Sequence, residues 1–252
     1  MGVLELVKFK TLTDLIDTDR SDNVVVVEIG SHWGQDTVRF IQAFKNVDIY
    51  SFEPHPQSSK INLQLIKEAL NGKKMNVFNQ QLSFGKVNFK LYQAAISDTN
   101  NPAMDFFCTY REHQESDKLD SERILIGNVA IDYENFCKKG IIAADGSSLN
   151  KILGDDKFET IKVKSFTLDN WYQTVEVSHI DLLWIDVQGH EKNVINGAIN
   201  TLKNVDYVIL EVGEEELYEG AMSAIETVEL MQSLSFEPIM DLGTDLLFRR
   251  KK

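Results

Sequence analysis

Four consecutive valines at residues 24–27 constrain the fold more than any other feature of the chain. β-branched residues favour a strand, and a run without polar alternation is typical of a strand that is buried on both faces. The run continues into Glu28-Ile29-Gly30, and residues 34–45 then have the apolar spacing of a helix. Strands buried on both faces belong to parallel sheets covered by helices. The chain is therefore predicted to contain an α/β domain.

Strands and helices alternate along most of the chain. Further strands are predicted at 47–52, 87–96, 180–185 and 205–211, and helices at 56–70, at 190–202 and through Ile225 and Leu234. Short connections between them make right-handed parallel crossovers the default. The C-terminal segment FEPIMDLGTDLLFRR reads as two strands around Gly243, which predicts a hairpin. We expect a mostly parallel sheet of seven strands with an antiparallel strand at its C-terminal end.

A single domain over residues 1–252 is predicted, because this length suits one hydrophobic core. The first 20 or so residues read as a short helical lead-in. Residues 98–160 are polar and interrupt the alternation, and they hold one plausible helix near 121–138. A connection of this length is expected to form a cap or lid beside the site.

Charge and composition exclude several classes of protein. A net charge of −13 opposes a broad nucleic-acid or anionic-membrane surface, and residues 249–252 form the single compact basic cluster. Two cysteines, Cys108 and Cys137, are too few for a disulfide framework or a thiolate zinc site. No apolar run reaches the length of a membrane span and no signal peptide is recognisable. We expect a soluble, cytoplasmic protein that binds neither nucleic acid nor a membrane.

Ligands of an open parallel sheet bind at the carboxyl ends of its strands. The residues that follow the predicted strands are 28–34, Glu53, 95–97, Asp186 and Glu211. Four of these five places carry a carboxylate. Acidic residues also cap helices that begin there, so one carboxylate alone leaves both interpretations open. The complete set favours a ligand site.

The loop from Gly30 to Gly34 is similar to a glycine-rich dinucleotide loop, but His32 occupies the place of its middle glycine. Histidine tolerates a left-handed backbone, whereas its side chain opposes close approach of a pyrophosphate. A nucleoside without phosphates, such as S-adenosylmethionine, avoids that conflict. Glu53 follows Gly30 by 23 residues, the spacing at which an acidic residue binds ribose hydroxyls in this architecture.

Six stretches of the chain resemble the FkbM family of S-adenosylmethionine-dependent methyltransferases. They are VVVVEIGSHWGQDT, YSFEPHP, YQAAISD, VKSFTLDNW, IDLLWIDVQGHEKNVINGA and YVILEV, and they cover about residues 24–240, with a poor match over 98–145. Ser31 and His32 replace the Ala and Asn of the family's first loop. Gln188 replaces the first Glu of its Ile-Asp-Val-Glu-Gly motif.

The resemblance implies a Rossmann-like class I methyltransferase fold with S-adenosylmethionine as cofactor. It implies that Glu28, Gly30, Ser31 and Gly34 line the methionine part, that Glu53 holds the ribose, that Ala95 and Ile96 border the adenine, and that Asp186 faces the transferred methyl group. His32 and Pro54 belong to the same two loops and are also candidate cofactor-binding residues. The implied reaction is methylation of a hydroxyl on a small-molecule or glycan acceptor.

Methyl transfer to an alcohol requires removal of a proton, and Asp186 and His190 are the candidate bases. A neutral histidine, with an ordinary pKa of about 6.5, suits that task near neutral pH. Asp186, Glu191 and Glu211 are also a conceivable Mg²⁺ site. The fifth strand is not followed by the Asp-Asn pair of catechol-type methyltransferases, so no metal is predicted.

Two other classes of function stay open. A nicotinamide-dependent dehydrogenase fits the sheet pattern and is disfavoured by His32 and by the C-terminal hairpin. A non-catalytic nucleoside-binding module would retain the loop without turnover, and the presence of Glu53 and Asp186 argues against it.

Overall fold

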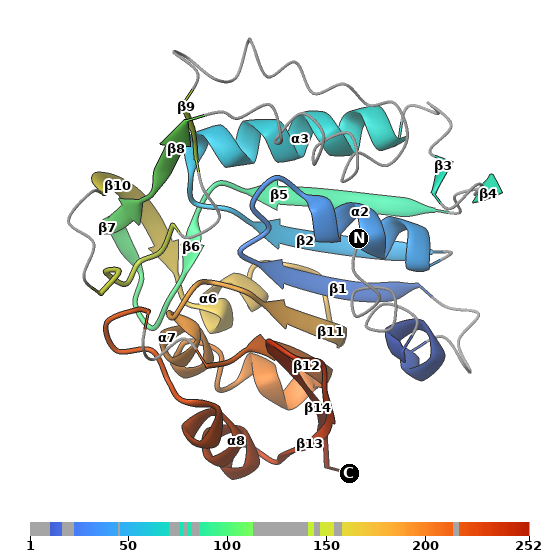
Figure 1. Cartoon of the computed structure of the whole chain (residues 1–252). Coiled ribbons are helices and arrows are strands. Elements are labelled where there is room, and N and C mark those ends of the chain that lie inside the picture. Colours follow the sequence, from blue (N-terminus) through green and yellow to red (C-terminus); the bar gives the residue numbers. More distant parts are fainter. Residues whose placement is uncertain are drawn as a thin grey trace.

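The computed structural model describes residues 11–16, 23–44, 46–70, 76–77, 80–81, 86–112, 141–143, 147–153, 158–213 and 217–251. A seven-stranded sheet in the order β13-β14-β12-β11-β1-β2-β5 forms its centre (Figure 1). These strands are β1 (Val24–Ile29), β2 (Val47–Phe52), β5 (Val87–Tyr92), β11 (Ile180–Ile185), β12 (Val205–Glu211), β13 (Phe236–Asp241) and β14 (Asp245–Arg250). β14 runs antiparallel to both β12 and β13, and the other pairings are parallel. The predicted sheet and its C-terminal hairpin are confirmed.

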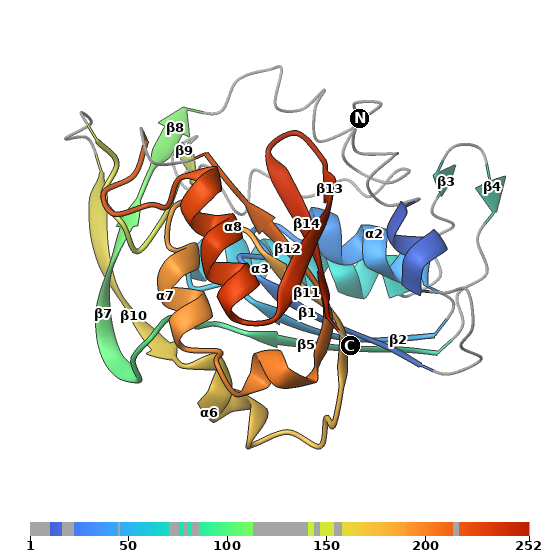
Figure 2. The same ribbon diagram turned by 90° about the horizontal axis from the view of Figure 1, so that it is seen from below.

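Helices cover both faces of the sheet (Figures 1 and 2). On one face Val26 packs in a cluster with side chains of α2 (Gln35–Ala43), of α3 (Pro56–Leu70) and of the helical residues 11–16. On the other face Val27 packs with α6 (Leu168–Tyr172), α7 (Glu191–Asn196) and α8 (Ala224–Ser233). Neighbouring valines of β1 thus enter opposite cores, which explains why this strand has no polar alternation.

The strand order of the sheet reverses next to β1. β2 and β5 extend the sheet on one side of β1, and β11 and β12 extend it on the other. The carboxyl ends of β1, β2 and β11 therefore meet at a switch in strand order, where open α/β sheets leave room for a ligand.

A small second sheet lies beyond those carboxyl ends (Figure 1). Its strands are β6 (Ala95–Ile96), β10 (Glu159–Phe166) and β7 (Asn101–Cys108). The prediction of one strand over 87–96 was wrong, because the chain turns at Ala94, whose N–H bonds to the Tyr92 carbonyl. β6 then pairs with Ser165 and Phe166 of β10 instead of with β2. Short strands β3 (Asn76–Val77), β4 (Gln80–Gln81), β8 (Tyr110–Glu112) and β9 (Ile141–Ala143) form two separate pairs.

The helix predicted over 190–202 was also wrong in its length. α7 ends at Asn196, and a 3₁₀-helix, η2 (Thr201–Asn204), follows it. Position 197 requires glycine, since a Cβ there would lie 2.1 Å from the carbonyl oxygen of Ser97, and glycine has a low helix propensity. The helix predicted near 121–138 lies outside the described residues. None of the described helices is long and apolar enough to span a membrane.

Candidate functional site

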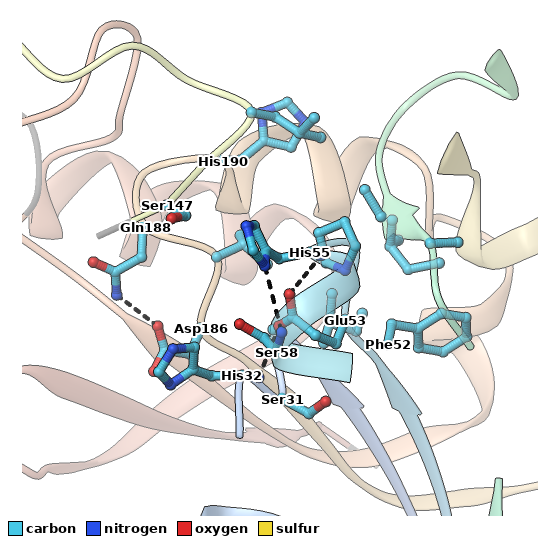
Figure 3. Close-up of a pocket in the computed structure, with 18 of the residues that line it drawn as sticks. Ser31, His32, Phe52, Glu53, His55, Ser58, Ser147, Asp186, Gln188 and His190 are labelled. Atoms are coloured by element: carbon cyan, nitrogen blue, oxygen red, sulfur yellow. Dashed lines mark hydrogen bonds between the residues drawn. The ribbon is translucent and has the colours of Figure 1, made fainter. Parts of the chain in front are cut away.

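A cavity of about 260 Å³ opens at the carboxyl ends of β1, β2 and β11 (Figure 3). Its walls come from the loops that follow these strands, from α2 and α3, and from the small sheet. The lining residues are Ile29, Gly30, Ser31, His32, Gln35, Asp36, Arg39, Phe52, Glu53, Pro54, His55, Ser58, Ala94, Ala95, Ile96, Phe106, Ser147, Leu149, Asp186, Val187, Gln188 and His190. Of the ten predicted cofactor residues, eight line this cavity, and Glu28 and Gly34 do not.

The loop after β1 is joined to both neighbouring strands. The N–H groups of Gly30 and Ser31 both donate to the carbonyl oxygen of Phe52, and the N–H of Asp186 donates to that of Ile29, each at 3.0 Å. A Cβ on Gly30 would lie 1.7 Å from the carbonyl oxygen of Asp186, so no other residue fits here. His32 has a left-handed φ of 45°. His32 thus adopts the left-handed backbone conformation that the sequence analysis expected it to tolerate in this turn.

Glu53 presents a buried carboxylate to the cavity. Its two oxygens accept hydrogen bonds from the backbone N–H groups of His32 at 2.8 Å and His55 at 2.7 Å. Burial raises the pKa of this carboxyl to about 7, although both hydrogen bonds oppose the rise. A carboxylate oxygen has room for a second donor. Glu53 is therefore held in place from the loops and retains the capacity to accept bonds from a ligand's hydroxyl groups.

Glu28 and Gly34 lie behind the loop instead of on the cavity wall. The buried Glu28 accepts hydrogen bonds from Thr37 Oγ1 and Ser51 Oγ, each at 2.5 Å, and burial raises its pKa to about 8. A Cβ on Gly34 would lie 2.8 Å from Asn62 Oδ1, and the amide of Asn62 donates to Ser31 Oγ at 2.9 Å. Glu28 and Gly34 therefore contribute to the packing behind the loop after β1 and not to the cavity wall.

The raised carboxyl pKa values of Glu28, Glu53 and Glu191 make the stability of the ligand-free protein depend on pH. The pKa is about 8 for Glu28 and about 7 for Glu53 and Glu191, against an ordinary 4.5 in the unfolded chain. The folded state therefore binds these protons more tightly, and their contribution to stability is complete below about pH 4.5 and is lost progressively until the pH has passed 7 and 8. The unfolding temperature is expected to fall between about pH 5 and pH 8 and then to level off, and Glu28→Gln should make this fall shallower. Scanning calorimetry at constant ionic strength checks this, and a flat wild-type profile would contradict it.

Asp186 lies beside a second carboxyl group, that of Glu211. Gln188 Nε2 is 2.8 Å from Asp186 Oδ1 (Figure 3). It is also 2.8 Å from Glu211 Oε2, and the hydroxyl of Tyr218 donates to Gln188 Oε1 at 3.0 Å. Burial raises the pKa of Asp186, while hydrogen bonds from Glu211 and Gln188 lower it. The structure thus brings together the two acidic residues that the sequence placed after β11 and β12.

His190 lines the cavity, and both of its ring nitrogens have partners. Nδ1 is 2.7 Å from Asn150 Oδ1, and Nε2 is 3.0 Å from Ser97 Oγ. The amide nitrogen of Asn150 donates to the Gly189 carbonyl, which leaves its oxygen to accept from Nδ1–H. Burial lowers the pKa of His190 to about 4, so the ring is neutral near pH 7. Its Nε2 faces Ser97 Oγ, whose hydroxyl also donates to Asp98 Oδ1 at 3.2 Å. Of the two candidate bases, Asp186 is the one whose side chain adjoins a second carboxyl group.

Several lining residues were missed by the sequence analysis. His55 directly precedes α3 and Ser58 lies in its first turn, where the Nδ1 of His55 accepts from the backbone N–H groups of Gln57 and Ser58. Their position after Glu53 was a signal, because the first turn of a helix that follows a strand faces the site. Phe106, Ser147 and Leu149 come from the polar insertion, where no motif distinguished them.

The carboxylates considered for a metal do not form such a group in the described residues. Glu191 Oε1 accepts from the backbone N–H groups of Val187 and Gly189, each at 3.2 Å, and so turns toward its own loop. The described side chains that are grouped closely enough to hold an ion are His179, Asp181 and Asp206. They lie where β11 and β12 begin, at the opposite end of these strands from the cavity.

Comparisons with known proteins agree with this geometry. Residues 28–238 match the model of the methyltransferase FkbM domain. The chain is also 26% identical, over 231 residues, to the 2-O-methyltransferase NoeI of Sinorhizobium fredii (strain NBRC 101917 / NGR234), a match that covers 90% of this chain and 80% of that protein. The match to the family model extends from the end of β1 to β13 and includes every strand end that forms the cavity. The chain therefore belongs to the FkbM family of methyltransferases, as the resemblance of its motifs predicted.

Proposed function

We propose that this protein is an S-adenosylmethionine-dependent O-methyltransferase whose acceptor is a hydroxyl of a glycan or another small polar molecule. The observation that carries the proposal is the buried Glu53 carboxylate, fixed by two backbone N–H groups at the wall of the cavity. Its place after β2 is where this architecture binds ribose hydroxyls. The 2-O-methyltransferase name of the relative supports transfer to oxygen.

The cavity suits an uncharged adenosyl group better than a dinucleotide. Ser58 Oγ is buried at the wall and has no hydrogen-bond partner among the described residues, so a ligand atom would satisfy it. His32 stands where a dinucleotide-binding loop has a glycine, and its side chain opposes the close approach that a pyrophosphate would need. We assign binding of the adenosyl group to Glu53, Ser58 and the loop after β1. We assign contact with its adenine ring to Ala95 and Ile96.

Bound S-adenosylmethionine would supply an electrophilic methyl group on a cationic sulfur. The residues of this chain then have two tasks, which are to orient the acceptor hydroxyl and to take its proton as the new carbon–oxygen bond forms. We assign the second task to Asp186. We assign orientation to residues at the other wall, namely His190, Phe106, Ser147 and Leu149. The last three belong to the 98–160 insertion, which we propose acts as a cap over the acceptor.

Calorimetric titration of the full chain tests the cofactor. S-adenosylmethionine and S-adenosylhomocysteine are expected to bind, NAD is not, and Glu53→Ala should weaken both adenosyl compounds by about 100-fold, the loss expected for two charge-assisted hydrogen bonds. Glu229→Ala, an exposed substitution on α8, is the matched control and should leave both affinities unchanged. Tight NAD binding without an adenosylmethionine signal would overturn the proposal in favour of a dehydrogenase.

A panel of acceptors then tests the reaction. Mono- and oligosaccharides with free hydroxyl groups, together with non-sugar alcohols, are incubated with S-adenosylmethionine, and release of S-adenosylhomocysteine is measured. We expect turnover with carbohydrate hydroxyls and a product that carries an added methyl ether. Cofactor binding without turnover on any class of hydroxyl would instead identify a non-catalytic nucleoside-binding module.

A further inference from the structure

Gln188 holds two carboxyl groups together at the edge of the cavity. Its amide nitrogen has two N–H donors, and it lies 2.8 Å from an oxygen of Asp186 and 2.8 Å from an oxygen of Glu211. The Tyr218 hydroxyl donates to the amide oxygen at 3.0 Å. The bond from Tyr218 holds the amide oxygen on the side away from the carboxyl groups. The amide nitrogen then faces them, which is the required orientation because only the nitrogen can donate to a carboxylate.

The backbone of Gln188 has a strained conformation. Its φ of 55° lies in the left-handed region, which is unfavourable for a residue other than glycine. Ser148 Oγ donates to the Gln188 carbonyl at 2.7 Å. The next residue, Gly189, has a φ of 88°, and a Cβ there would lie 2.5 Å from the Cβ of Tyr218. Strain that the surroundings maintain in this way is concentrated at functional sites.

The acidic pair lies in surroundings that favour protonation. An oxygen of Asp186 and an oxygen of Glu211 each lie 2.8 Å from the same Gln188 nitrogen, and two carboxyl groups that close together disfavour a negative charge on both. Burial raises the pKa of Asp186, and so do the charges of Asp36 on α2 and Asp245 on β14. The acidic groups that also feel the charge of Asp186 are Glu28 on β1, Glu53 after β2 and Glu191 on α7. The bonds from Gln188 act in the opposite direction, because N–H donors stabilise the charged form of a carboxyl group.

We propose that Gln188 is a positioning residue that keeps Asp186 and Glu211 as a pair with one shared proton and one negative charge at the cavity wall. The inference rests on the proposed function, in which this charge faces the cationic sulfur of S-adenosylmethionine. S-adenosylhomocysteine has a neutral sulfur and gains little from the same charge. The role of Gln188 should therefore appear as a preference between these two ligands, which is measurable without knowledge of the acceptor.

The test is Gln188→Met, which preserves the length of the side chain and removes its N–H donors. Dissociation constants of S-adenosylmethionine and S-adenosylhomocysteine are measured calorimetrically with the full chain at pH 6, 7 and 8. At pH 7 we expect affinity for S-adenosylmethionine to fall about tenfold and affinity for S-adenosylhomocysteine to change less than about twofold. The pH below which S-adenosylmethionine binding weakens should move upward by about one unit, because the pair takes up its second proton more readily.

Two further variants make the result decisive. Tyr218→Phe frees the amide oxygen of Gln188 and should shift the ligand preference in the same direction by about threefold. Gln232→Met, at an exposed position on α8, is the matched control and should change neither affinity. Equal weakening of both ligands in Gln188→Met would mean a merely structural role and would overturn the proposal. If Gln188→Met does not fold, an unchanged preference in Tyr218→Phe overturns it. Wild-type protein that binds neither ligand would instead refute the proposed function.

Discussion

Gly30→Ala is expected to destabilise the protein by about 4 kcal/mol or more, beyond what most single substitutions cause. The added Cβ would lie 1.7 Å from the carbonyl oxygen of Asp186, an atom of the neighbouring backbone that no side-chain rotation can move away. β1 and β11 would have to separate at their carboxyl ends, where the Asp186 N–H bonds to Ile29. Since about 1 kcal/mol shifts the unfolding temperature by about 2–4 °C in a chain of this size, the expected decrease is about 10 °C.

A second variant, Gly243→Ala, distinguishes the effect of the steric clash at Gly30 from the effect of backbone strain. Gly243 has a φ of 92°, close to the 89° of Gly30, but a Cβ there has no neighbour within 4 Å. Alanine at this turn should therefore show the strain of the left-handed region alone, about 1–2 kcal/mol. Thermal unfolding of both variants and the wild type checks the difference. Similar losses of stability in the two variants would show that the contact with Asp186 is unimportant.

The inner strands could be predicted from the sequence because each is mostly buried and none has an exposed residue. All six residues of β11, IDLLWI, are buried, and the predicted bounds of β11 and β12 agree with the structure. β7 was missed for the opposite reason. Only Phe106 and Cys108 of its eight residues are buried, and its partner β10 begins about 50 residues later. Local hydrophobic patterns carry no information about a pairing of this kind.

The site could be located from the sequence, but the direction of its side chains could not. The rule that ligands bind at strand ends correctly selected the loops after β1, β2 and β11 as walls of one cavity. Glu28 illustrates the limit of that rule. It is still within β1, and its side chain turns toward Thr37 on α2 and Ser51 on β2 instead of toward the cavity. Such a choice depends on tertiary partners that lie 9 and 23 residues away.

The hydrogen bonds of His190 change how the two candidate bases are weighed. From the sequence, Asp186 and His190 were equal candidates. In the structure Nε2 of His190 lies 3.0 Å from Ser97 Oγ, and Nδ1 lies 2.7 Å from Asn150 Oδ1. Both ring nitrogens therefore face protein atoms, which suits a residue that positions its neighbours. We therefore propose that the carboxylate of Asp186 takes the acceptor proton.

Asp186→Asn is accordingly expected to lower turnover by about 10²–10⁴-fold at saturating S-adenosylmethionine and acceptor, the usual contribution of a general base. An amide of the same shape accepts no proton, so the loss should appear in kcat, while S-adenosylhomocysteine still binds. His190→Gln, which keeps a polar side chain between Ser97 and Asn150, should lower kcat less than about tenfold. Glu229→Gln, at an exposed position on α8, makes the same change from carboxylate to amide away from the cavity, and it is the matched control that should leave kcat unchanged. A large loss in His190→Gln combined with a loss of only a few-fold in Asp186→Asn would reverse the assignment, because the proton would then have to pass to the histidine.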